Sequence, residues 1–199
     1  VLTTHRSSGG GAGLRILTQT VTSPTLAAQL HQILQQYPGS RWHQYEPLHP
    51  NNSAAGAHQA FGVNVQPVYR FDQAKVIVSL DDNFLFDHPG SVRYARDFIN
   101  GRRVRSGRRE MNRLYVAEST PTITGAMADH RTAVKPSAIE TIARQLQSGN
   151  GGDAWVQAAV HDLNANRGAS LIIVGESQPP TVHAIAHAMN VALGNVGKT

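Results

Sequence analysis

Residues 111–146 read MNRLYVAESTPTITGAMADHRTAVKPSAIETIARQL, and this stretch decides the expected fold. It opens with the apolar run 114–117, whose aromatic and β-branched residues are typical of a short buried strand. The run stops at the polar cluster 118–121, where a proline ends any strand ladder. After a loop of small residues, Pro136 is well placed to begin a helix. A strand, a polar loop and a helix in this order form the repeating unit of α/β sheets, which bind ligands at the loop after the strand.

The same alternation continues along the chain on both sides of this stretch. Hydrophobic segments at residues 14–21, 74–80 and 169–174 and an alternating pattern at residues 41–46 predict four further strands. Run 74–80 (AKVIVSL) is continuously apolar, as strands of parallel sheets usually are. Helical patterns lie between the runs, and such helices cross over the faces of a parallel sheet. The sequence therefore predicts an α/β fold, a Rossmann-like parallel sheet with helices on both faces.

The composition is typical of a globular protein. The 199 residues are 40% hydrophobic and 16% charged, unlike a disordered chain. The chain has no cysteine, which excludes disulfides and thiolate metal sites within these residues. No apolar run approaches the ~20 residues of a membrane helix, so no direct membrane insertion is expected. We expect a flexible Gly-rich linker at 1–13 and one domain over 14–199, a fragment of a longer chain because it starts at Val1 and stops abruptly at Thr199.

Basic residues crowd into one segment of the chain. The eight arginines are Arg93, Arg96, Arg102, Arg103, Arg105, Arg108, Arg109 and Arg113. A nucleic-acid site is one interpretation of such a cluster. The segment has few aromatic residues and no known nucleic-acid motif, which favours a solvated loop or a surface for a protein partner. We therefore expect no nucleic-acid partner.

Two groups of charged residues allow a catalytic or metal-binding interpretation. Asp81, Asp82 and Asp87 with His88 could bind a hard metal, but the end of a strand often carries such residues as caps, and we favour that structural role. Residues 129–131 place an acid, a histidine and an arginine side by side. Adjacent side chains diverge, so these residues do not form a catalytic triad, and an ion-paired loop is expected.

His183 and His187 are four residues apart and share one face of the last helix. The glutamate of a zinc-protease motif is missing, so we expect each histidine to pack against the sheet with one nitrogen hydrogen-bonded. The sequence contains no nucleophile elbow, no Walker motif and no dinucleotide glycine motif. The residues alone predict a ligand-binding or scaffold domain.

Several of these segments resemble the molybdopterin oxidoreductases of the dimethyl sulfoxide reductase family. The resemblance covers nearly the whole chain from residue 14, and it implies a middle α/β domain of that family. The segments that carry it are 74–83 with His88 and Pro89, 116–120 at the family's Asp-Pro-Arg loop, 124–129, 134–136, 171–175 and 190–197.

The resemblance also implies which residues occupy the cofactor loops. A degenerate site for the pterin guanine dinucleotide would be lined by Asp81, Asn83, Glu118, Thr120 and Asp129. Asp81 stands where the family has a glycine, and a carboxylate there repels a phosphate. Glu118-Ser119-Thr120 replaces Asp-Pro-Arg, so the cation that could pair with a phosphate is lost. Residues 137–140 replace Gly-Thr-Asp and shift the acid by one position. These changes predict a fold that is retained after its cofactor site has decayed.

More narrowly, residues 23–26, 45–47 and 118–131 resemble the large iron–sulfur subunit of bacterial alternative complex III. The resemblance implies a structural domain of a quinol-oxidising respiratory oxidoreductase. No molybdenum cofactor is expected in this fragment, which alone is predicted to be inactive, and iron–sulfur clusters are expected only elsewhere in the full-length protein. The implied partners are other subunits of a membrane-bound electron-transfer complex on the periplasmic face. The alternative is part of the dinucleotide pocket of an active molybdopterin oxidoreductase.

Overall fold

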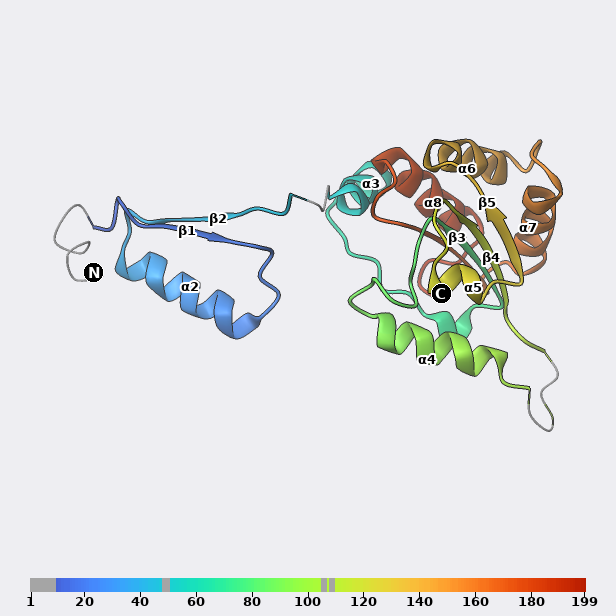
Figure 1. Cartoon of the computed structure of the whole chain (residues 1–199), viewed down its shortest axis with the longest axis horizontal. Coiled ribbons are helices and arrows are strands. Elements are labelled where there is room, and N and C mark those ends of the chain that lie inside the picture. The colour runs from blue at the N-terminus through green and yellow to red at the C-terminus, as the bar shows by residue number, and fades with distance from the viewer. Residues whose placement is uncertain (1–9, 48–50, 105–106, 108–109) are drawn as a thin grey trace. The chain divides into compact units, whose positions relative to one another are not determined.

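The computed structural model describes residues 10–47, 51–104, 107 and 110–199 (Figure 1). The chain divides into two compact units, Val1–Pro50 and Asn51–Thr199. The division falls inside the single domain expected over 14–199. Most of the expected linker, residues 1–9, lies outside the described residues.

The first unit is one strand–helix–strand motif. Strands β1 (Arg15–Thr18) and β2 (Arg41–Gln44) pair in parallel, and α2 (Pro24–Gln36) connects them. The helix begins here because Ser23 accepts a hydrogen bond from the Leu26 N–H and proline occupies the first turn. These two strands form their own sheet. The expectation that they join the main sheet is therefore wrong, because a strand pattern does not determine which strands pair.

The second unit contains a parallel sheet of four strands in the order β5-β4-β3-β6. Its strands are β3 (Val76–Leu80), β4 (Arg113–Glu118), β5 (His130–Ala133) and β6 (Ser170–Val174). Leu80 lies opposite Ala117 on one side and Val174 on the other, so three strands end at the same level. We call this end of the sheet the carboxyl end and the opposite end the amino end.

Helices cover both faces of this sheet (Figure 1), which confirms the predicted α/β fold with a Rossmann-like parallel sheet. The helices and 3₁₀ turns are α3 (Asn52–Phe61), η1 (Phe71–Gln73), α4 (Ser91–Arg102), α5 (Ile123–Ala126), η2 (Pro136–Ala138), α6 (Ile139–Ser148), α7 (Ala154–Ala165) and α8 (Pro180–Ala192). Alternate residues of each strand face opposite sides, so Val78 and Tyr115 pack with α6, α7 and α8 while Ile77 and Leu114 pack with α4.

Strand β5 was not expected, because its segment was predicted to be a loop. Its sequence HRTA has no apolar run, and three of its four residues are exposed. It is an edge strand that, among the described residues, pairs only with β4, in the register Tyr115 to His130. An edge strand needs little hydrophobic sequence, because neither of its faces has to be fully buried.

The opposite edge of the sheet is capped by side chains. Asn190 of α8 accepts a hydrogen bond from the Ile172 N–H (3.1 Å) and donates one to the Ile172 carbonyl (2.8 Å), as a neighbouring strand would. Thr199 donates to the Ser170 carbonyl at 2.6 Å, and Asn195 accepts from the Ser170 hydroxyl at 3.2 Å. The outer edge of β6 is therefore occupied by polar groups of the same chain.

Candidate functional site

The strand order creates a topological switch point between β3 and β6. The chain leaves β3 toward β4 and β5, and it returns to the other side of β3 as β6. In open parallel sheets, ligands bind at the carboxyl ends of the two strands where the direction of progression reverses. The candidate site therefore lies at the carboxyl end, among the loops that follow β3, β4 and β6.

Asp81 closes this position by joining the three loops. Its backbone has φ 55°, in the left-handed region that aspartate tolerates better than most residues. Its Oδ1 accepts hydrogen bonds from the Ser119 N–H and hydroxyl, both at 2.9 Å. Its Oδ2 accepts one from Gln178 Nε2 at 2.7 Å. The carboxylate is thus held by groups from the loops after β4 and β6.

Gly175 closes the crevice at the level of the backbone. Its N–H donates to the Leu80 carbonyl at 3.0 Å, so the chain after β6 stays against the chain after β3. A Cβ at Gly175 would lie 1.9 Å from the Asp81 carbonyl oxygen. Only glycine allows this approach. A phosphate would have to displace backbone here and face a carboxylate, so these residues do not fit a dinucleotide phosphate.

Asn83 connects the loop after β3 to α5. Its Oδ1 accepts hydrogen bonds from the Thr124 N–H (3.3 Å) and hydroxyl (3.0 Å). Its Nδ2 donates to Asp87 Oδ2 at 3.0 Å. The side chain is committed to bonds within the protein on both its donor and its acceptor side.

Glu118, the last residue of β4, is a buried carboxylate with 1% of its surface exposed. Its Oε1 accepts a hydrogen bond from Arg131 Nε at 2.5 Å, and its Oε2 accepts one from the Thr122 hydroxyl at 2.7 Å. A Cβ at Gly125 would lie 1.9 Å from Oε1, so α5 covers the carboxylate closely. Glu118 therefore joins β4, α5 and β5, while Thr120 two residues later is exposed.

Asp129 lies at the other end of the sheet. It precedes β5, and its Oδ2 accepts a hydrogen bond from the N–H of Leu114 near the start of β4 (2.8 Å). It forms an ion pair with Arg102 at 2.6 Å. The structure thus brings Asp81, Asn83 and Glu118 to the carboxyl end, and it puts Asp129 at the amino end. The ion pairs expected for residues 129–131 are present, but their partners lie outside that segment. Asp129 pairs with Arg102, and Arg131 pairs with Glu118.

The loop after β3 also contains a buried acid–histidine pair that the sequence suggested only as capping residues. Asp82 has 3% of its surface exposed, and its Oδ2 lies 2.8 Å from His88 Nε2. The other oxygen, Oδ1, is buried and has no hydrogen-bond partner in the described part of the chain. The rings of Tyr69 and Tyr94 pack around His88 with centroids 6.3 Å and 5.9 Å away.

The pKa of Asp82 and the pKa of His88 are both raised, for different reasons. Burial raises the pKa of Asp82, against the opposing effect of His88. Burial acts to lower the pKa of His88, but the hydrogen bond and charge of Asp82 outweigh this effect. The pKa of His88 therefore lies above its ordinary value.

Within the described ranges, no three His, Cys, Asp or Glu residues are grouped so that they could hold a metal ion.

The two histidines of α8 face α3 rather than the sheet, which corrects their predicted packing. A Cβ at Gly56 of α3 would lie 2.3 Å from His183 Cβ, and the Phe61 and His187 rings are 5.1 Å apart. His183 Nε2 is buried without a hydrogen-bond partner among the described residues. Burial lowers the pKa of His183 and of His187, because the charged imidazolium is poorly solvated between the helices.

These opposite shifts predict two separate pH effects on the free energy of unfolding. The raised pKa of His88 stabilises the fold below about pH 6.5, the unfolded value, and this contribution is lost as the pH rises through the folded pKa. The lowered pKa of His183 has the opposite sign, and its stability is lost as the pH falls below about 6.5. Urea unfolding across this range checks both effects.

We expect the advantage of wild type over His88→Gln to shrink as the pH rises above about 6.5. Relative to His183→Gln, wild type should instead lose stability as the pH falls below about 6.5. Each variant serves as the control for the other. Parallel pH profiles for wild type and both variants would contradict the prediction.

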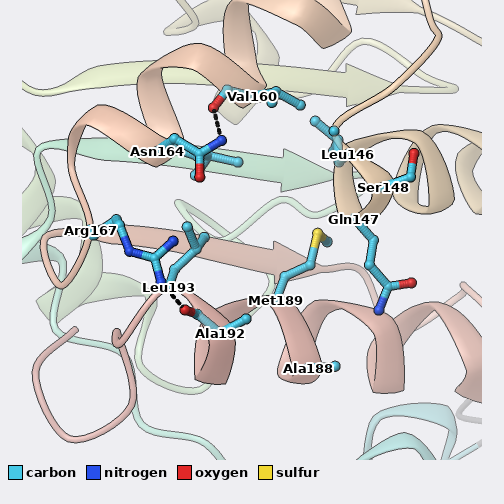
Figure 2. Close-up of a pocket in the computed structure, with 12 residues that line it drawn as sticks. Leu146, Gln147, Ser148, Val160, Asn164, Arg167, Ala188, Met189, Ala192 and Leu193 are labelled. Carbon is cyan, nitrogen blue, oxygen red and sulfur yellow. Dashed lines mark hydrogen bonds between the residues drawn. The ribbon is translucent and has the colours of Figure 1, made fainter.

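A pocket of about 310 Å³ lies elsewhere, among the last turns of α6, α7 and α8 (Figure 2). It is lined by apolar residues, among them Leu146, Val160 and Met189, and by polar residues that include Asn164 and Arg167. The C-terminal ends of helices carry partial negative charge, which disfavours a phosphate. Arg167 offsets this charge only in part, because its Nη2 donates to the Ala192 carbonyl. This pocket therefore does not fit a dinucleotide phosphate either.

No protein-family model matches the chain, and no curated protein matches it. Among the described residues, the helices are all too short or too polar to span a bilayer.

The sequence did not indicate Gln178, Gly175 and Ser119 as residues of the candidate site. Gln178 lies 97 residues from its partner Asp81, so no local pattern could have found this contact.

Proposed function

We propose that Asn51–Thr199 is a structural domain of a molybdopterin-oxidoreductase-like subunit, without a molybdenum cofactor of its own. The subunit would belong to a quinol-oxidising electron-transfer complex at the periplasmic face of a bacterial membrane. The observation that carries the proposal is the Asp81 carboxylate, which is bonded to Ser119 and Gln178 at the position where such folds bind ligands. The family and the complex rest on the sequence resemblance.

Three further contacts support a structural role for the carboxyl end. Asn83 is bonded to Thr124, Glu118 is paired with Arg131, and the backbone of Gly175 lies against that of Asp81. Each contact joins two elements of the sheet or its helices. Polar groups that are satisfied within the protein rigidify a fold and have little capacity left for a ligand.

The alternative is a domain that supplies part of the dinucleotide pocket of an active molybdopterin oxidoreductase. One observation favours it, namely that the order β5-β4-β3-β6 creates the topological switch point at which α/β sheets bind nucleotides. A bound dinucleotide would require the Asp81–Gln178 hydrogen bond to open.

Calorimetric titration with guanosine diphosphate, the guanine nucleotide half of the dinucleotide, tests the proposal on the purified chain. We expect no binding to wild type, because phosphate meets the Asp81 carboxylate and closed backbone. Micromolar affinity that falls at least tenfold in Asn83→Ala would contradict the proposal and favour the alternative. Asn164→Ala at the helix pocket is the matched control, since it removes an amide far from the carboxyl end.

Metal analysis of the full-length protein gives a second measurement. Molybdenum well below one atom per chain is the expected result, in a protein recovered with the membrane complex. Stoichiometric molybdenum would decide for the active oxidoreductase.

A further inference from the structure

The β1–β2 sheet of the first unit has one covered face and one exposed face. The Trp42 indole donates to the Thr18 hydroxyl at 2.9 Å and lies 5.9 Å from the ring of His31 on α2. This contact places α2 over the face that carries Trp42 and Thr18. Figure 1 shows the helix lying along the two strands. Side chains alternate along a strand, so Arg41 and His43 point to the opposite face. That face is exposed at both residues.

The exposed face is basic and partly apolar. Arg15 lies directly opposite Arg41 in the strand register, and Leu17 lies opposite His43. Leu17 and Tyr45 have exposed fractions of 70% and 63%. Two arginines opposite each other repel, and a bound anion would offset that cost.

Little within the first unit can neutralise these arginines. Glu46 is the only acidic residue among residues 1–50, and its Oε1 accepts a hydrogen bond from the Thr20 N–H at 2.8 Å. Arg15 Nη1 donates to the Ala12 carbonyl at 2.6 Å, which fixes the guanidinium but supplies no negative charge. The face therefore has the charge that complements an acidic partner.

The sheet also has open strand edges. It contains two strands in the described residues, so β2 pairs with β1 on one side and leaves its other edge without a neighbouring strand. An extended peptide binds such an edge through backbone hydrogen bonds, with alternate side chains on one face. On that face, its side chains would lie beside Arg41, His43 and Tyr45.

We propose that β2 and the exposed face of this sheet bind an extended, acidic protein segment. Glutamate or aspartate side chains of the segment pair with Arg41 and Arg15, while its backbone adds a strand to β2. The inference rests on the proposed function in one respect, namely that another subunit of the complex supplies the segment.

Fluorescence anisotropy with a labelled octapeptide of alternating glutamate and valine tests this on the full chain at low ionic strength. We expect saturable binding that weakens at least tenfold in Arg15→Glu/Arg41→Glu. The matched control, Arg103→Glu/Lys135→Glu, changes the net charge equally on exposed residues of the second unit and should bind like wild type. The single variant Arg41→Gln keeps the Arg15 contacts and should weaken binding severalfold, so a folding defect in the double variant leaves the test intact.

Three outcomes would overturn the inference. They are no peptide binding, equal loss in the control variant, and tighter binding of an oligothymidylate or of anionic phosphatidylglycerol vesicles than of the peptide. The guanosine diphosphate titration measures a different unit of the chain. Failure of the peptide test therefore leaves the proposed function standing, and failure of the proposed function removes only the expected source of the segment.

Discussion

Gly175→Ala is expected to lower the free energy of unfolding of the second unit by about 3 kcal/mol, the upper end of overpacking costs. The added Cβ would lie 1.9 Å from the Asp81 carbonyl oxygen and 2.7 Å from its carbon. Both atoms belong to the backbone, so no flexible side chain can move aside. Relief requires β3 and β6 to separate at their carboxyl ends. Urea unfolding measured by circular dichroism should show a lower midpoint at an unchanged slope.

Gly194→Ala is the control for this prediction. Gly194 has φ 70°, and a Cβ there would meet nothing within 4 Å. Its replacement tests backbone strain alone, at about 1 kcal/mol. If Gly175→Ala were no more destabilising than Gly194→Ala, the close approach at Gly175 would not be a constraint on the fold.

Arg131→Ala is expected to cost about 3 kcal/mol of stability, the scale for removing one partner of a buried ion pair. Glu118 would stay buried, and of its two hydrogen-bond partners in the described part of the chain the Thr122 hydroxyl alone would remain. The exposed pair of Arg144 and Glu140, at 2.7 Å along one helix turn, has similar geometry and is the matched control. Arg144→Ala should cost about 0.5 kcal/mol, because solvent screens that pair.

A second substitution separates charge from packing at this position. If an uncompensated charge causes the loss, adding Glu118→Gln to Arg131→Ala should recover part of it. Equal costs for Arg131→Ala and Arg144→Ala would contradict the role assigned to the buried pair.

The strands of the main sheet with continuous apolar sequence could be predicted, and the edge strand could not. β3, β4 and β6 are buried along nearly their whole length, and hydrophobic runs identify such strands. β5 has a polar sequence and is held mainly by backbone pairing with β4. The pairing of β1 with β2 in a separate sheet depends on long-range contacts, which periodicity does not describe.

The missed strand also explains the misplaced site residue. Without β5, Asp129 belongs to the loop after β4 and lies at the same end as Glu118. Because β5 begins at His130 and runs parallel to β4, Asp129 instead lies at the amino end. Asp81 and Asn83 follow a strand that the sequence identified, and they were placed correctly at the carboxyl end. The position of a polar residue is thus predictable only as far as its neighbouring strand is.

The side-chain cap on β6 covers one edge of this sheet against pairing with a second molecule. The strand sequence SLIIV is uncharged and rich in β-branched residues, which is the composition of segments that form amyloid-like stacks. Asn190 occupies its backbone edge from α8, so the edge is unavailable to a second molecule while that helix is docked. Detachment of α8 would remove this cap even with the other strands still paired. We therefore expect aggregation through the β6 edge to require only a local opening of this helix.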